Sequence, residues 1–81
     1  MSSVTELTKE SVPGLWDRRQ ELFLQDSVSL ANVPVDSAGI AFLVRWTKSL
    51  KDGKKLTIKD ASDDVVRLIN VFKISQLFAM E

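Results

Sequence analysis

A carboxylate and a hydroxyl stand side by side at Asp36 and Ser37, shortly before an apolar run that spans residues 40–44. Pro34 lies two residues upstream, where it removes a backbone N–H donor and keeps the preceding residue out of helical angles. Asp and Ser are both good N-cap residues, so a turn followed by the start of a helix is predicted here. A hydroxyl at such a helix end is exposed beside unpaired backbone N–H groups, which suits a docking point or a switch.

The side chains on which most enzymes depend are missing from this chain. Its 81 residues include no His, no Cys and no Tyr. The commonest general base, the thiolate nucleophile and the commonest metal ligands are therefore absent. The sequence also lacks a Gly-rich phosphate-binding loop. We therefore expect a protein that is not an enzyme and that uses no cofactor and no metal.

The charge balance and the lengths of the apolar runs limit the kinds of partner that we expect. Lys plus Arg and Asp plus Glu number 11 each, so the net charge is zero. A nucleic-acid-binding domain usually needs a basic excess, so no nucleic acid is expected as a partner. No apolar run is long enough to span a membrane, and the first residues lack the pattern of a signal peptide. We expect a single cytoplasmic domain over residues 1–81 without direct membrane insertion.

Apolar residues at helical spacing predict three helices. The first covers about residues 11–23 with Ser11 as its N-cap, and its apolar face holds Val12, Leu15, Trp16, Leu22 and Phe23. The second covers about residues 38–50, and its main face holds Ile40, Leu43, Val44, Thr47 and Leu50. The third begins at a Ser62 cap, and its inner face holds Val65, Leu68, Ile69 and Phe72.

Short alternating segments between the helices predict strands. Val28 and Leu30 alternate with serines, Leu56 and Ile58 alternate with polar residues, and a further short segment covers residues 4–7. The tail over residues 75–81 is apolar but too short for a strand prediction. Strands separated by single helices indicate an α/β fold with a small, mostly parallel sheet and crossover helices.

The four residues Asp36-Ser37-Ala38-Gly39 resemble the Asp-Ser-x-Gly signature of STAS domains, the fold of anti-sigma factor antagonists. Glu6-Leu7 is similar to the end of the second STAS strand, and the order of elements around the signature agrees with that family. The resemblance implies a STAS-like fold, and too few residues precede Val4 for its first strand. Either that strand is missing, or the true start of the protein lies further upstream. It also implies a binding domain rather than a catalytic one.

Within STAS domains, the chain resembles the small subunit of Mla-type phospholipid ABC transporters. The supporting segments are Leu15-Trp16-Asp17, the signature, and the Val-x-x-Leu-Ile pattern over residues 65–69. This resemblance implies an accessory subunit that binds and stabilises the transporter ATPase, and through it the permease, with a role in outer-membrane lipid asymmetry. Such a subunit is cytoplasmic and peripheral to the inner membrane. The alternative is an anti-sigma factor antagonist, whose partner kinase phosphorylates Ser37.

Seven residues are candidates for partner binding or for the switch: Trp16, Asp36, Ser37, Ala38, Gly39, Phe42 and Trp46. Helix capping alone would explain Asp36 and Ser37, while docking and phosphorylation remain the functional alternatives for Ser37. Trp16 is expected in the core, with an interface role as its alternative. Phe42 and Trp46 are expected to reach the surface, because another side of their helix already supplies a core face.

Overall fold

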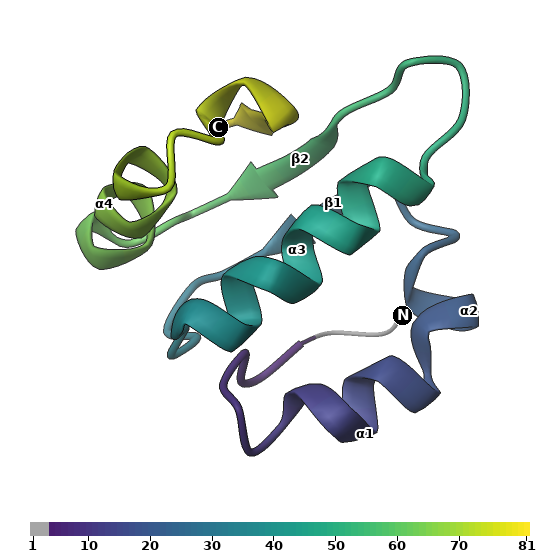
Figure 1. Cartoon of the computed structure of the whole chain (residues 1–81), viewed down its shortest axis with the longest axis horizontal. Helices are drawn as coiled ribbons and strands as arrows, with labels where there is room; N and C mark the ends of the chain where they lie inside the picture. The colour runs from purple at the N-terminus through teal and green to yellow at the C-terminus, as the bar shows by residue number, and fades with distance from the viewer. Residues whose placement is uncertain (1–3) are drawn as a thin grey trace.

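The computed structural model describes residues 4–81, and within them the chain forms an α/β fold (Figure 1). Helix α3 (Ser37–Ser49) lies at the centre, with α4 (Asp63–Val71) on one side and α1 (Val12–Asp17) and α2 (Arg19–Leu22) on the other. Strands β1 (Ser27–Ser29), β2 (Leu56–Lys59) and β3 (Phe78–Met80) complete the fold, and a short 3₁₀ helix, η1 (Ser75–Leu77), precedes β3. None of the helices in this described part is long and apolar enough to cross a membrane.

The three strands form a parallel sheet in the order β1-β2-β3. Val28 pairs with Ile58, and Leu56 pairs with Phe78. Helix α3 connects β1 to β2, and α4 connects β2 to β3. The predicted α/β class, the parallel sheet and the crossover helices are therefore confirmed for the described residues. The tail, for which the sequence supports no strand, forms β3 because it pairs with β2.

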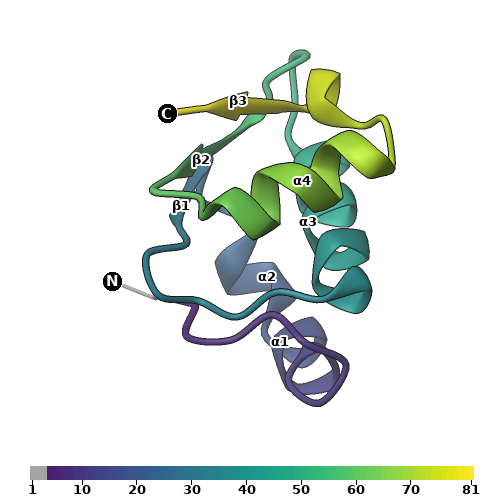
Figure 2. The same cartoon turned by 90° about the vertical axis from the view of Figure 1, so that its left-hand side faces the viewer.

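The sheet buries one face only. The inner face carries Val28, Leu56, Ile58 and Phe78, all of them buried. Ser29, Lys59 and Ala79 point to the other face and are exposed. Figure 2 shows α3 and α4 on the same side of the sheet. This alternation differs from the continuous apolar strands of parallel sheets that are covered on both faces.

The chain before α1 differs from the sequence prediction. Residues 4–7 do not form a strand: Leu7 makes an isolated parallel bridge with Val35. Ser11 is also not a side-chain cap, because its hydroxyl accepts from the Thr8 N–H (2.9 Å) and donates to the Glu6 carbonyl (3.0 Å). These bonds close the turn before α1. The expected absence of a strand before Val4 concerns positions outside the described residues.

The predicted first helix is interrupted at Arg18. Its backbone N–H bonds to the Leu15 carbonyl three residues back (3.0 Å), which ends α1 in a tight turn before α2 begins. No Pro or Gly marks this break, so the sequence gives no sign of it. Leu15 and Leu22 are nevertheless both buried, as the apolar spacing predicts.

Helix α4 begins as predicted but ends earlier than its apolar face suggests. The Ser62 hydroxyl accepts from the Val65 N–H (3.3 Å), which confirms the predicted cap. Val65 and Ile69 are buried, and Leu68 is half-buried. The prediction is wrong for Phe72, which lies just past the last turn of the helix and is 46% exposed.

Four aromatic rings pack together between α3 and the two short helices. Phe23 stacks on Trp46 with ring centroids 5.7 Å apart, and Phe42 lies 5.5 Å from Phe23. Phe42 is 2% exposed and Trp46 is 1% exposed, so the expectation that they reach the surface is wrong. They are buried because α1 and α2 fold over this side of α3. Trp16 lies at the edge of the cluster and is 39% exposed, which contradicts the expectation of a core position.

Truncation of a ring in this cluster should cost much of the stability of the domain. We expect Phe42→Ala to lower the free energy of unfolding by about 3–5 kcal/mol, because it leaves a cavity in the core. A chain of this length has roughly 4–12 kcal/mol in total. Leu24→Ala is the control, since Leu24 is 87% exposed and should change stability by less than about 0.5 kcal/mol. Urea denaturation of both variants measures the effect, and similar midpoints would contradict it.

Candidate functional site

The carboxylate of Asp36 joins two segments of the chain at the start of α3. Asp36 has extended backbone angles and is the N-cap of α3, and its Oδ1 accepts from the Gly39 N–H (3.1 Å). Its Oδ2 accepts from the Lys9 N–H, 27 residues earlier in the sequence (2.9 Å). The first bond satisfies a donor of the first helical turn, which otherwise has no partner within the helix. The second bond ties the segment before α1 to the same turn.

Backbone hydrogen bonds strengthen this junction. The Leu7 N–H donates to the Pro34 carbonyl (2.8 Å), and the Asp36 N–H donates to the Leu7 carbonyl (3.0 Å). Leu7 is fully buried, so its backbone crosses the turn from inside the protein. The turn and the N-terminal segment therefore form one hydrogen-bonded unit.

Gly39 is required because the Leu7 backbone passes close to it, a contact that we call the Leu7 crossing. A Cβ atom at this position would lie 1.9 Å from the Leu7 carbonyl oxygen and 2.7 Å from the Leu7 carbonyl carbon. These are backbone atoms, so the clash cannot be relieved by a side-chain rotation. The Asp and the Gly of the Asp-Ser-x-Gly pattern thus share one structural purpose, which is to hold Leu7 against the first turn of α3. Ala38 lies between them and is half-buried.

Ser37 does not take part in holding Leu7 or in capping α3. It is the first residue of α3, and Asp36 is the cap, so the interpretation of Ser37 as the N-cap is wrong. Its side chain is exposed, and its hydroxyl has no hydrogen-bond partner among residues 4–81. The hydroxyl is therefore available to a partner or to a modifying enzyme.

An apolar hollow begins beside Ser37. We call it the Ser37 groove; it has a volume of about 470 Å³, and it is lined by Ser37, Ile40, Ala41, Val44, Arg45, Phe72 and Ile74. The first five residues come from α3, and the last two come from the segment that follows α4. Sequence reasoning missed this groove because it places Phe72 in the core. Its signal in the sequence is the adjacent apolar pair Val71 and Phe72, because two neighbouring residues cannot both lie on the inner face of α4.

The other candidate residues lie on a different side of α3. Phe42 and Trp46 are buried under α1 and α2, so the structure does not bring them to the surface near Ser37. The Trp46 indole N–H donates to the Gln25 carbonyl (2.9 Å), which satisfies this group inside the protein. Trp16 is partly exposed, and the Arg19 guanidinium carbon lies 4.5 Å from the centre of its ring.

The electrostatics of the turn favour an ionised Asp36. The N–H groups of Lys9 and Gly39 hold the pKa of the Asp36 carboxyl below its ordinary value of 3.8. Hydrogen bonds to the charged form lower a carboxyl pKa in this way. No group of three or more carboxylates, His or Cys that could hold a metal occurs among the described residues.

Comparisons of the chain with protein-family models, with curated proteins and with solved structures give no match.

Substitution of Gly39 should disrupt the junction with Leu7. We expect Gly39→Ala to lower the free energy of unfolding by about 1–3 kcal/mol or more, because the Leu7 backbone must move. Gly14→Ala is the matched control, because Gly14 is also helical and has no atom within 4 Å of an added Cβ. That control should raise stability or leave it unchanged, since Ala favours a helix over Gly. Equal denaturation midpoints for the two variants would contradict the close approach of Leu7.

The lowered pKa of Asp36 predicts a pH dependence of stability. Because the folded state holds this proton less tightly than the unfolded state, the ionised carboxylate stabilises the fold above pH 3.8. That contribution is lost as the pH falls through the lower folded pKa. We therefore expect wild type to exceed Asp36→Asn in stability at neutral pH, and the difference to shrink below pH 3.8. Denaturation curves across this range test the prediction, and a constant difference would contradict it.

Proposed function

We propose that this protein is a non-catalytic accessory subunit that binds and stabilises the ATPase of a phospholipid-transporting ABC complex. Its docking surface is the exposed Ser37 together with the adjoining Ser37 groove. The protein is then peripheral to the inner membrane through the ATPase and its permease, and it contributes to outer-membrane lipid asymmetry. The partner in this proposal comes from the resemblance to STAS subunits of Mla-type transporters.

The observation that carries the proposal is the contrast between Ser37 and its neighbours. Asp36 and Gly39 are both fixed by the Leu7 crossing, whereas the Ser37 hydroxyl has no partner within the described chain. The hydroxyl also lies at the rim of an apolar groove that includes the partly exposed Phe72. Exposed aromatic area is enriched in protein interfaces, and polar groups are common at their rim.

The proposed STAS-like fold is supported by the same junction. The Asp-Ser-x-Gly pattern lies at the turn between a parallel strand and a crossover helix. The parallel contact between Leu7 and Val35 brings the N-terminal segment beside the residues that precede this turn. These features agree with the order of elements that the resemblance implies.

A phosphorylation switch is the second candidate function, and the free Ser37 hydroxyl favours it as well. A phosphate there would add a charge of about −1.5 to −2 in the first turn of α3, where the helix dipole stabilises negative charge. The fold would therefore tolerate the modification. The partner surface would change, because the charge would lie at the rim of the apolar groove. In this alternative the protein is an anti-sigma factor antagonist, and its partner is an anti-sigma factor kinase.

The docking proposal predicts that Ser37 variants lose binding but not stability. Ser37→Ala should stay within about 0.5 kcal/mol of wild type, because no hydrogen bond is lost. Ser62→Ala removes a true cap and should cost about 0.5–2 kcal/mol. Ser37→Asp should fold well but co-purify poorly with the ATPase, since a charge that loses its hydration at an interface is unfavourable. Thermal melts and co-purification from cells that express both subunits measure the two effects.

Ser62→Asp is the matched control for the charge. It adds the same charge at the start of another helix, where Asp caps as well as Ser, and it should co-purify normally. Normal co-purification of Ser37→Asp would remove the Ser37 surface from the interface. Intact mass spectrometry of the protein from its native host separates the two candidate functions. A dominant species that is heavier by one phosphate would favour the antagonist.

A further inference from the structure

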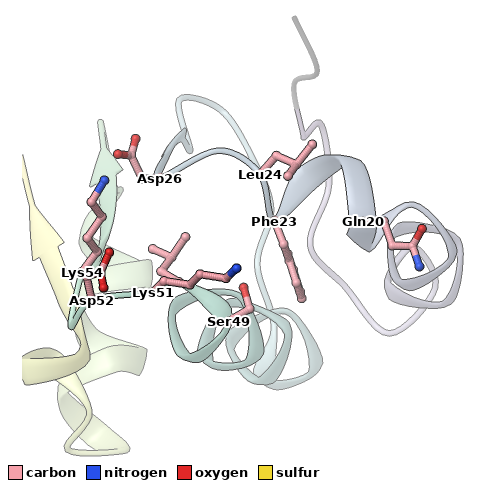
Figure 3. A pocket seen from close by; sticks show the side chains of 9 residues that line it. Gln20, Phe23, Leu24, Asp26, Ser49, Lys51, Asp52 and Lys54 are labelled. Carbon is pink, nitrogen blue, oxygen red and sulfur yellow. The ribbon is translucent and has the colours of Figure 1, made fainter.

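A second hollow surface lies between α2 and α3, away from Ser37. It consists of two adjoining hollows of about 470 and 410 Å³, and both are lined by Gln20, Phe23 and Ser49. We call this surface the α2–α3 groove. Figure 3 shows Phe23 and Leu24 on one side of it and Ser49 and Lys51 on the other. It is therefore formed by the ends of two helices that approach each other from distant parts of the sequence.

The floor and the edge of this groove are apolar. The Phe23 ring belongs to the aromatic cluster, so its position is fixed by Phe42 and Trp46 behind it. Trp16 lines one end and is 39% exposed, and Leu24 lines the other end and is 87% exposed. Apolar side chains from a partner could thus pack against a rigid aromatic surface.

The groove is also strongly basic. Two carboxylates line it, those of Asp26 and Asp52, against five cations: Arg19, Arg45, Lys48, Lys51 and Lys54. None of the four cations on or after α3 has an ion-pair partner among residues 4–81. Arg19 is held in place, because its guanidinium donates to the Trp16 carbonyl (2.9 Å) and lies over the Trp16 ring. Free cations around an apolar floor are complementary to a ligand that combines acidic and apolar groups.

The zero net charge of the chain does not reveal this basic surface. The cations at residues 45–55 lie on α3 and before β2, whereas Asp60, Asp63 and Asp64 follow β2. Because β2 separates them, the basic and acidic groups lie toward opposite ends of the strand. The zero net charge of the whole chain therefore does not describe the local distribution of charge.

We propose that the α2–α3 groove binds an acidic polypeptide segment of a partner protein, with apolar side chains against Phe23 and carboxylates beside Lys48 and Lys51. A polypeptide is the favoured occupant, because one segment can place apolar side chains against Phe23 and carboxylates beside the cations that line the groove. This interaction is a second contact, and it does not depend on Ser37.

The natural tryptophans provide the readout. The probe is a short synthetic peptide in which glutamates alternate with leucines, and the matched peptide has lysine in place of every glutamate. We expect the acidic peptide to bind, to protect Trp16 from acrylamide quenching, and to bind more weakly as salt increases. Trp46 is buried with or without peptide, so the change in quenching reports on Trp16. Trp16→Phe should abolish the fluorescence change while calorimetry still detects binding.

Charge reversal in the groove tests the site. The double variant Lys48→Glu with Lys51→Glu should weaken binding by roughly tenfold or more, because attraction is replaced by repulsion. The control is Lys59→Glu with Arg67→Glu, which changes the net charge equally at exposed positions outside the groove. All four side chains are exposed, so both double variants should keep the far-UV circular dichroism spectrum of the wild type. Ser37→Asp should leave peptide affinity unchanged, which separates this test from that of the docking surface.

Several outcomes would overturn the proposal. These are no binding of the acidic peptide, equal binding of the lysine peptide, or equal losses in the two double variants. Binding to phosphatidylglycerol vesicles that depends on Lys48 and Lys51, without peptide binding, would instead identify a lipid surface. Self-association that disappears in the Lys48 and Lys51 variant would mean that the acidic end of a second copy occupies the groove.

Discussion

The two hydrogen bonds of the Asp36 carboxylate determine how the N-terminal third of this protein meets the rest. One oxygen caps α3 through Gly39, and the other accepts from Lys9. The second bond is a long-range contact, and it fixes the segment before α1 against the turn that follows β1. With the Leu7 backbone held in the same place, α1 and α2 begin from a defined position and can cover the aromatic side of α3. Asp36 therefore caps α3 and also makes a tertiary contact.

Much of the fold could be predicted because its signals are local. Alternation identified β1 and β2, helical spacing identified α3 and α4, and Ser62 is the cap that its position suggests. The missed features depend on contacts between distant segments. Strand β3 is only three residues long and exists through pairing with β2. The break at Arg18 occurs where no helix-breaking residue stands, so the local sequence cannot mark it.

The turn and helix start at residues 36–39 were predicted in position, but the separate roles of their residues were not. Asp36 and Gly39 were identified as part of a motif, yet only the Leu7 crossing explains why a Gly is needed. The second apolar side of α3 led to an expectation of exposed aromatic residues at Phe42 and Trp46. A helix with two apolar sides can expose one of them, or it can bury both against different elements. Here the sheet covers one side of α3, and α1 with α2 covers the other. The sequence of α3 cannot distinguish these cases.

Helix α3 connects both proposed binding surfaces, so its rigidity matters for function. Thr47 is buried, and its hydroxyl accepts from the Leu56 N–H (3.0 Å) and donates to the Leu77 carbonyl (2.6 Å). These bonds attach the end of α3 to β2 and η1, while Asp36 attaches its beginning to Lys9. Arg45 lines both the Ser37 groove and the α2–α3 groove, so the two surfaces adjoin. Because α3 is fixed at both ends, a partner could engage both surfaces without a rearrangement of the helix, and ordering this part of the chain would cost little on binding.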